Sequence, residues 1–408
     1  MIGPGERRAR AALAVAVEAG TPGVSAAVAE HGAEAVLAGL RGRRPETPGG
    51  AAARARARRV DGAEVLAEAG RVGLRLACPG DPEWPSRLDD LDLREPREGV
   101  GGVPLGLWVA GHHDLAEVAE RSVSVVGARA CTSYGTEVAG DLAAGLADRG
   151  WAVVSGGAYG IDAAAHRGAL VARGVTVAVL ACGADQAYPR GNAALLSRIA
   201  ADGLVVAELP PGAHPTRARF LARNRLIAAL STGTAVVEAA ARSGALSTLR
   251  WAGHLDRVLM AVPGPVTSAL SVGAHVALRD GAHLVTGSAD VLDLVGSLSL
   301  DAAPTPRGPE RPWDGLPATA RTVLEALPSR GTRTVEDLSR RTGLPDADVR
   351  AELARLRLDD LADRDLEGWR LGRAAREARA AERAAARAAA DESEAGHRVA
   401  GAPPVVGP

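Results

Sequence analysis

The chain has 408 residues, 47% of them hydrophobic, which is enough for a large buried core and about two to four domains. Its formal net charge is only −1, and its positive side chains are all arginines because lysine is absent. Its three cysteines (Cys78, Cys131 and Cys182) are too few and too far apart to suggest a disulfide framework or a paired-cysteine metal site. The start has no apolar leader and no apolar run reaches the roughly 20 residues of a membrane span, so we expect a cytoplasmic protein without membrane contact.

The first 75 residues are typical of a small helical module with a linker. Residues 8–40 have the spacing of short helices, with a break at the GTPG of residues 20–23, and residues 41–59 are rich in Arg, Ala, Pro and Gly without apolar periodicity, which indicates a loop. A module of this kind, similar to SAM or helix-hairpin-helix domains, either holds a DNA backbone through its turn or is a plain packing domain. The sequence leaves both interpretations open.

A turn-rich connector follows between Cys78 and Gly111. We expect five large apolar side chains to pack it onto the next domain: Trp84, Leu88, Leu91, Leu107 and Trp108.

From residue 123 onward, strand patterns alternate with helix patterns. The predicted strands are Val123–Gly127, Trp151–Ser155, Thr176–Leu180, Leu204–Glu208, Thr234–Glu238 and Val258–Val262, and the predicted helices are Gly135–Arg149, Ile161–Arg173, Asn192–Ala201, Phe220–Leu230 and Ala245–Leu255. This order predicts an α/β core over residues 76–296, with a Rossmann-like, doubly wound and mostly parallel sheet covered on both faces. Ligands of such folds bind beyond the carboxyl ends of the strands, so the loops there are the candidate site.

The last part of the chain has a different pattern. Residues 297–312 are rich in Ser, Pro and Arg and predict a linker. Residues 313–372 predict a winged-helix domain, with helices at Pro317–Leu327, Thr334–Thr342 and Asp346–Leu356 before two short strands around Glu367 and Gly368. The third helix carries both acids and arginines, so protein contact or self-regulation is as good an interpretation as base reading. Residues 373–408 predict an Ala/Arg-rich helix and a disordered tail.

The most informative stretch is the glycine turn between Trp151 and Asp162. The predicted strand ends at Ser155, and the chain passes Gly156, Gly157 and Gly160 before the next helix. Glycines permit tight turns and close ligand approach, and the N–H groups at a helix start favour phosphate. The turn is not a G-x-G-x-x-G, so it does not support dinucleotide binding, and a purely structural turn is the alternative.

Two further segments carry positive charge to the same edge. Arg129 follows Gly127 at the end of the first strand, where it either clamps phosphate or is an ordinary surface charge. Between Glu208 and Glu238 there is no acid, whereas four arginines fall there beside the neutral Asn224: Arg217, Arg219, Arg223 and Arg225. We interpret them as a polyanion site, with a solvated helix face as the alternative. Phe220 lies among them and can stack on unpaired bases.

Evidence for catalysis is weak. Asp162 and His166 share a helix face, but a structural hydrogen bond or a favourable helix N-terminal charge explains Asp162. The other histidines have no metal-ligand spacing, and neither a P-loop nor a nucleophile elbow occurs. We therefore predict no catalytic residue, no metal and no cofactor.

Five segments together resemble the DNA-processing protein A (DprA/Smf) family over about residues 80–295. They are VGARACTSYG at 126–135, SGGAYGIDAAAHRGAL at 155–170, CGADQAYP at 182–189, FLARNRLIAAL at 220–230 and VVEAAARSGALST at 236–248. The resemblance implies a cytoplasmic homodimer that binds single-stranded DNA without sequence preference and loads RecA recombinase during natural transformation, with no established catalytic activity. By motif, it assigns DNA contacts to Arg129, Arg217, Phe220, Arg223, Asn224 and Arg225, and backbone contacts to Gly127, Ser155, Gly156 and Gly157.

Two other functions stay open. The second hypothesis is a nucleotide-processing Rossmann enzyme related to the lysine-decarboxylase-like phosphoribohydrolases. Such an enzyme needs an acid near residues 244–251, but this chain has GALSTLRW there, which contains no Asp or Glu. A regulatory protein that acts through the winged helix is the third hypothesis.

Overall fold

The computed structural model of the protein describes residues 2–42, 49–296 and 311–384. The chain divides into two compact units, Met1–Ala303 and Pro304–Pro408. The division falls inside the predicted linker, of which only residues 311 and 312 are described, and the predicted disordered tail lies outside the described residues. The boundary at residue 75 stays a prediction, because the N-terminal helices and the sheet belong to the same unit.

The N-terminal part of the chain forms five helices, of which the first four pack around a small apolar cluster that contains Leu13 and Leu40, and the fifth packs through Ala69 beside Ala11. The five helices are α1 (Pro4–Ala16), α2 (Val24–His31), α3 (Ala33–Arg41), α4 (Gly50–Ala57) and α5 (Gly62–Arg71). The prediction of a loop over residues 41–59 is wrong for α4. This helix buries Ala53 and Ala57, which are one turn apart, and because its only apolar side chains are alanines the sequence shows no clear period.

Within the described residues, the same unit contains a nine-stranded sheet in the order β1-β2-β6-β5-β4-β3-β7-β8-β9. Its strands are β1 (Arg75–Ala77), β2 (Leu107–Ala110), β3 (Ser122–Val126), β4 (Ala152–Ser155), β5 (Thr176–Leu180), β6 (Leu204–Ala207), β7 (Gly233–Val236), β8 (Val258–Ala261) and β9 (His283–Leu284). Strands β3 to β9 pair in parallel, which confirms the predicted doubly wound sheet. Chain order reverses between β3 and β7, and such a switch point is where these folds bind ligands.

The segment expected to be a connector contributes to the sheet. Its five large apolar side chains are buried as predicted, but Leu107 and Trp108 lie in β2, which pairs antiparallel with β6. Between β1 and β2, the 3₁₀ helix η1 (Ser86–Leu91) buries Leu88 and Leu91. The four-residue β2 lies among glycines and prolines and was therefore hard to tell from a loop.

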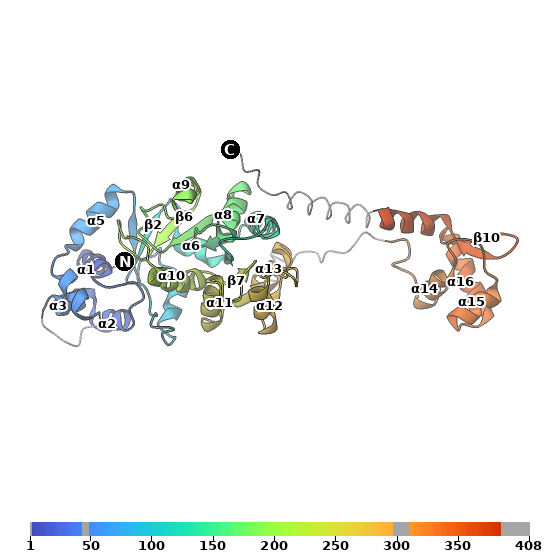
Figure 1. The fold of residues 1–408 in the computed structure, drawn as a ribbon, viewed down its shortest axis with the longest axis horizontal. Coiled ribbons are helices and arrows are strands. Elements are labelled where there is room, and N and C mark those ends of the chain that lie inside the picture. Colours follow the sequence, from blue (N-terminus) through green and yellow to red (C-terminus); the bar gives the residue numbers. More distant parts are fainter. Residues whose placement is uncertain (1, 43–48, 297–310, 385–408) are drawn as a thin grey trace, which may run out of the picture. The chain divides into compact units, whose positions relative to one another are not determined.

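Helices cover both faces of the sheet (Figure 1). One face carries α7 (Ser133–Ala147), α8 (Ile161–Val171), α9 (Ala193–Asp202) and α13 (Ser288–Val295), and the other carries α10 (Arg217–Leu230), α11 (Ala245–His254) and α12 (Val272–Arg279). Strand β3 shows the alternation: Val123 and Val125 pack toward α7 and α8, whereas the Ser124 hydroxyl donates a 2.8 Å hydrogen bond to the Ile227 carbonyl of α10. The short α6 (Leu115–Glu120) leads into β3.

The second unit has the predicted winged-helix elements. They are α14 (Ala318–Ala326), α15 (Val335–Thr342), α16 (Asp346–Leu358) and the antiparallel strands β10 (Ala362–Arg364) and β11 (Trp369–Leu371). Val323, Leu338 and Leu353 bring the three helices together in one core. Residues 373–384 continue as a helix, as predicted.

Candidate functional site

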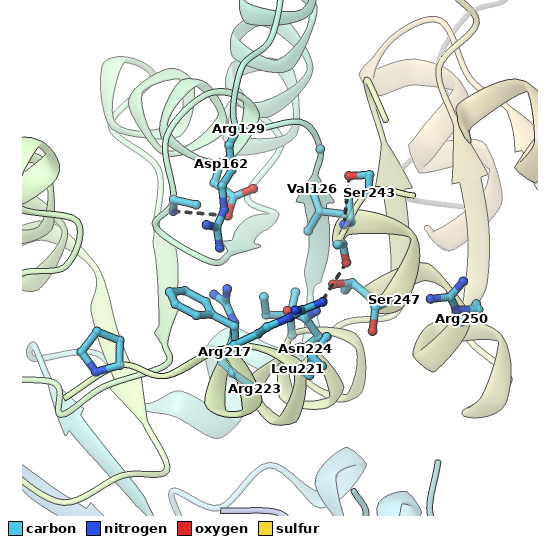
Figure 2. Close-up of a pocket in the computed structure, with 18 of the residues that line it drawn as sticks. Val126, Arg129, Asp162, Arg217, Leu221, Arg223, Asn224, Ser243, Ser247 and Arg250 are labelled. Atoms are coloured by element: carbon cyan, nitrogen blue, oxygen red, sulfur yellow. Dashed lines mark hydrogen bonds between the residues drawn. The ribbon is translucent and has the colours of Figure 1, made fainter. Parts of the chain in front are cut away.

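A cavity of about 690 Å³ opens at the switch point between β3 and β7. Its walls come from the loops after five successive strands, β3 to β7, and from α10 and α11. The lining contains one carboxylate, Asp162, and five arginines: Arg129, Arg217, Arg223, Arg242 and Arg250. Figure 2 shows the α10 residues on one side of this space and Arg129 and Asp162 on the other. This excess of positive charge at the carboxyl edge favours a polyanionic ligand.

Phe220 lies between two of the cavity arginines, Arg129 and Arg223. The guanidinium carbon of Arg129 lies 4.8 Å from the centroid of its ring, and that of Arg223 lies 5.9 Å away. The ring of Tyr188 packs against it at a tilt, with 5.9 Å between centroids. Arg129, Phe220 and Arg223 therefore lie together at the edge of the sheet where the sequence placed them, and the exposed Arg129 offers a guanidinium plane as a second surface on which a base can stack.

The glycine turn seats Arg223. This side chain is only 6% exposed and donates a 2.6 Å hydrogen bond from Nη1 to the Val179 carbonyl. A Cβ on Gly156 would overlap Nη1, so only glycine leaves room for the guanidinium. Burial lowers the pKa of Arg223 to about 10, and Asp162 opposes that shift, so Arg223 is a cation at neutral pH.

Asp162 has a structural role in the same turn. Its Oδ2 accepts hydrogen bonds from the backbone N–H groups of Gly156 at 3.2 Å and Ala158 at 3.3 Å. Burial raises the pKa of Asp162, whereas the Arg223 guanidinium and these N–H groups act in the opposite direction. The neighbouring His166 is fully buried against the Thr176 hydroxyl, at 2.7 Å from Nδ1. Asp162 Oδ2 and His166 Nδ1 thus have partners inside the fold, whereas His166 Nε2 is buried without a hydrogen bond to any described residue.

The predicted backbone contacts of Ser155, Gly156 and Gly157 need correction. All three residues are buried and none lines the cavity, where Ala158 represents the turn instead. The Ser155 hydroxyl donates to the Val125 carbonyl at 2.7 Å, and Gly157 has a φ of +67° and packs close to Leu180. The turn therefore acts on the site indirectly, because it joins β4 to α8 and positions the Arg223 side chain.

Gly127 lies on the cavity wall, and its backbone contact with DNA stays a prediction. A Cβ there would come 2.8 Å from Ile161 Cβ and 2.9 Å from the Glu238 carbonyl oxygen, so the position has no room for a side chain. The next residue, Ala128, donates its N–H to that same Glu238 oxygen at 2.7 Å. The loop after β3 is thus fixed against the end of β7, and Arg129 leaves it at a defined point.

Helix α10 presents one face to the cavity. Arg217, Phe220, Leu221 and Asn224 have the i, i+3, i+4, i+7 spacing of a single helix face, and all four line the space. Thr216 caps the helix start by accepting a 3.3 Å hydrogen bond from the Arg219 N–H. Asn224 is buried, and its amide donates to the Gly244 carbonyl at 3.4 Å, which ties α10 to the start of α11.

The assumption that all four arginines of α10 lack carboxylate partners is wrong for two of them. Arg225 is fully buried and makes a two-pronged ion pair with Glu208, with N–O distances of 2.6 and 2.7 Å. Arg219 pairs with Glu18, which follows α1, at 3.0 Å. Both arginines lie off the cavity face and hold the N-terminal helices and β6 to α10, so neither lines the site.

The family described as DNA recombination-mediator protein A matches residues 75–296, more than half of the chain. A putative DNA processing protein DprA of Mycobacterium tuberculosis is 49% identical over 334 residues, which are 81% of this chain and 84% of that protein. The chain belongs to this family. The DNA processing protein DprA of Streptococcus pneumoniae is 42% identical over 210 residues, 51% of this chain and 72% of its own length. The X-ray structure of the S. pneumoniae DprA covers 73% of this chain and 100% of its own, with 30% identity and a TM-score of 0.59.

In this DprA family member, two arginines of the cavity were not predicted from the sequence. Arg242 follows β7 and Arg250 lies on α11, and both side chains are exposed. Among the described residues, neither makes a hydrogen bond or an ion pair. A signal for them existed, since they follow the carboxyl end of the strand that borders the switch point.

The described part of this family member contains no group of three or more His, Cys, Asp and Glu side chains that could hold a metal ion. Over the same residues, no helix combines the length and the apolar character of a membrane span.

Proposed function

We propose that this member of the family binds single-stranded DNA in the cavity between β3 and β7 and acts in DNA recombination. The observation that carries the proposal is the set of arginines around Phe220. Arg129 and Arg217 are exposed and, within the described residues, neither has a carboxylate partner. The names of the family and of its relatives, which speak of DNA processing and recombination, agree with a nucleic acid as the ligand.

The chemistry of the wall favours an unpaired strand. Phe220, Tyr188 and the guanidinium plane of Arg129 offer stacking surfaces, and a base must leave its duplex to reach them. Guanidinium groups that bind phosphates, and rings that accept any base, carry no information on base identity. We therefore propose binding without sequence preference.

We propose further that the chain forms a homodimer and loads RecA recombinase onto single-stranded DNA in natural transformation. This finer role rests on the likeness to DNA-processing protein A and on the recombination-mediator description of the family. Sedimentation equilibrium tests the dimer. RecA filament formation on DNA coated with single-strand binding protein tests the loading, and we expect this chain to accelerate it.

Anisotropy titrations of labelled single- and double-stranded oligonucleotides, each over a range of salt concentrations, test DNA binding. We expect tighter binding of the single strand and a log–log salt slope of about −0.7 for each phosphate neutralised. Arg217→Ala should weaken binding, whereas Arg279→Ala, an exposed arginine of α12 outside the cavity, should not. Wild-type protein that prefers neither form, or equal effects of the two variants, would refute the proposal.

A further inference from the structure

We propose that a second, smaller pocket beside the cavity holds the next nucleobase of the same bound strand. This inference rests on the proposed function. The pocket has a volume of about 130 Å³ and lies between the loop at residues 97–100 and helices α10 and α11.

The two spaces share a wall. Leu221 of α10 and Ser247 and Arg250 of α11 line both the large cavity and the small pocket. Leu221 is 38% exposed, so an apolar side chain and a guanidinium face solvent where one space leads into the other. A strand that leaves the cavity past Arg250 therefore enters the pocket across the three side chains that line both spaces.

The walls of the pocket suit a base with phosphates beside it. Val100, Ala218, Leu221 and the indole of Trp251 provide apolar surface, and Trp251 is only 5% exposed and fixed in the main core. Arg250 and Arg97 add a guanidinium each. A nucleotide combines these two needs, because it carries an apolar ring face next to an anionic phosphate.

The outer wall is already formed. Arg97 and Val100 exchange two backbone hydrogen bonds, of 2.8 and 2.9 Å, around a turn in which Glu98 and Gly99 have φ of +51° and +78°. The Gly101 N–H donates to the Gly20 carbonyl at 3.0 Å, which anchors this hairpin to the N-terminal helices. A preformed wall lowers the ordering cost of binding. Glu98 is exposed and is the one carboxylate in the lining, so the phosphates should lie on the Arg97 and Arg250 sides.

Ala218→Trp tests the pocket, because Ala218 is exposed on α10 and lines the small pocket but not the large cavity. The probes are labelled oligothymidylates of roughly 4 to 16 nucleotides, the range of site sizes known for single-strand binding folds. Wild-type affinity should step up once the strand reaches the second pocket. Filling the pocket should weaken binding of the longer strands about tenfold, the loss of one stacked base, and leave the shortest strands unchanged.

Arg97→Ala is the second variant, and it should reduce the salt slope for long strands by about 0.7 without changing that for short ones. Ala194→Trp on α9 and Arg279→Ala on α12 are matched exposed controls, and both should bind every length as the wild type does. Wild-type binding by Ala218→Trp at every length would overturn the inference and leave the pocket to an apolar side chain of a protein partner. Equal weakening at every length would overturn it as well, since the pocket would then not be a separate subsite. Failure of the wild type to bind any strand would instead refute the proposed function itself.

Discussion

The guanidinium of Arg129 lies over the ring of Phe220, with 4.8 Å between the guanidinium carbon and the ring centroid. The loop after β3 thereby contacts the first turn of α10, which follows β6, although these segments are far apart in the sequence. The contact forms a composite surface in which charge and stacking come from different side chains. Their contributions can therefore be separated by substitution.

Arg129→Lys keeps the positive charge and removes the planar group, whereas Phe220→Ala removes the ring and keeps every charge. We expect Phe220→Ala to weaken single-strand binding by about 1–3 kcal/mol with no change in salt slope. Arg129→Lys should keep the slope but bind more weakly than the wild type, and Arg129→Ala should lower the slope by about 0.7. Anisotropy titrations at several salt concentrations measure both quantities. A changed slope in Phe220→Ala would contradict the assignment.

Gly156→Ala should displace the Arg223 guanidinium, because the added Cβ overlaps Nη1 of this buried side chain. We expect a loss of about 1–3 kcal/mol in the free energy of unfolding, together with weaker DNA binding. Gly140→Ala in α7 is the control, since open space surrounds its Cβ, and it should stabilise the protein by up to about 1 kcal/mol. Urea unfolding measures both. Equal stability of the two variants would show that Gly156 does not seat Arg223.

Arg225→Ala should lower the stability of the fold, whereas Arg217→Ala should lower DNA affinity. Arg225 is fully buried in its ion pair with Glu208, so its removal leaves a carboxylate that is only 12% exposed without its partner and should cost about 3–5 kcal/mol of unfolding free energy. Arg217 is exposed on the cavity wall, and its loss should reduce DNA affinity with little change in stability. Calorimetry and anisotropy on the same preparations separate the two. If Arg225→Ala lost DNA binding while keeping its melting temperature, Arg225 would contact DNA after all.

Glu18→Gln should strengthen DNA binding. Glu18 pairs with Arg219 at 3.0 Å. Its neutralisation leaves the Arg219 guanidinium without a carboxylate partner among the described residues, held only by its 2.6 Å hydrogen bond to the His214 carbonyl beside the cavity. Because the pair is partly exposed, we expect a gain of only about threefold in affinity, with a salt slope steeper by up to 0.7 or about one phosphate. Glu30→Gln on α2 makes the same change of charge away from α10 and should leave binding unaltered. A Glu18→Gln variant indistinguishable from it would show that Arg219 does not reach DNA.

Stability should fall in mild acid because of His166. Burial lowers the pKa of this imidazole from 6.5 to about 3, so between these values the unfolded chain binds the proton and the folded chain does not. The contribution of His166 to stability is therefore complete above the unfolded pKa and is lost as pH falls toward the folded one, by about 2 kcal/mol between pH 6.5 and roughly pH 5. His166→Asn should flatten this part of the stability curve, as followed by urea unfolding. An unchanged curve would assign the acid sensitivity to other groups.

Much of the fold could be predicted because burial leaves a local pattern. The runs that form β3 to β7 are buried on both faces and are therefore recognisable as strands in the sequence, and the intervening helices show their own period. Elements without such a pattern were missed. The alanine helix α4 and the short edge strand β9 bury too few large side chains to be recognised.

The sequence by itself determined that arginines and one phenylalanine follow the ends of parallel strands, and the topology of such sheets requires those ends to meet at one edge. Only the tertiary structure decided which arginines are free to bind. Arg225 and Arg219 form ion pairs with Glu208 and Glu18. Arg242 reaches the cavity from the loop before α11, and Arg250 reaches it from α11 itself. The reason is physical: an ion pair depends on the distance between two charges in space, and no local period of the chain encodes that distance.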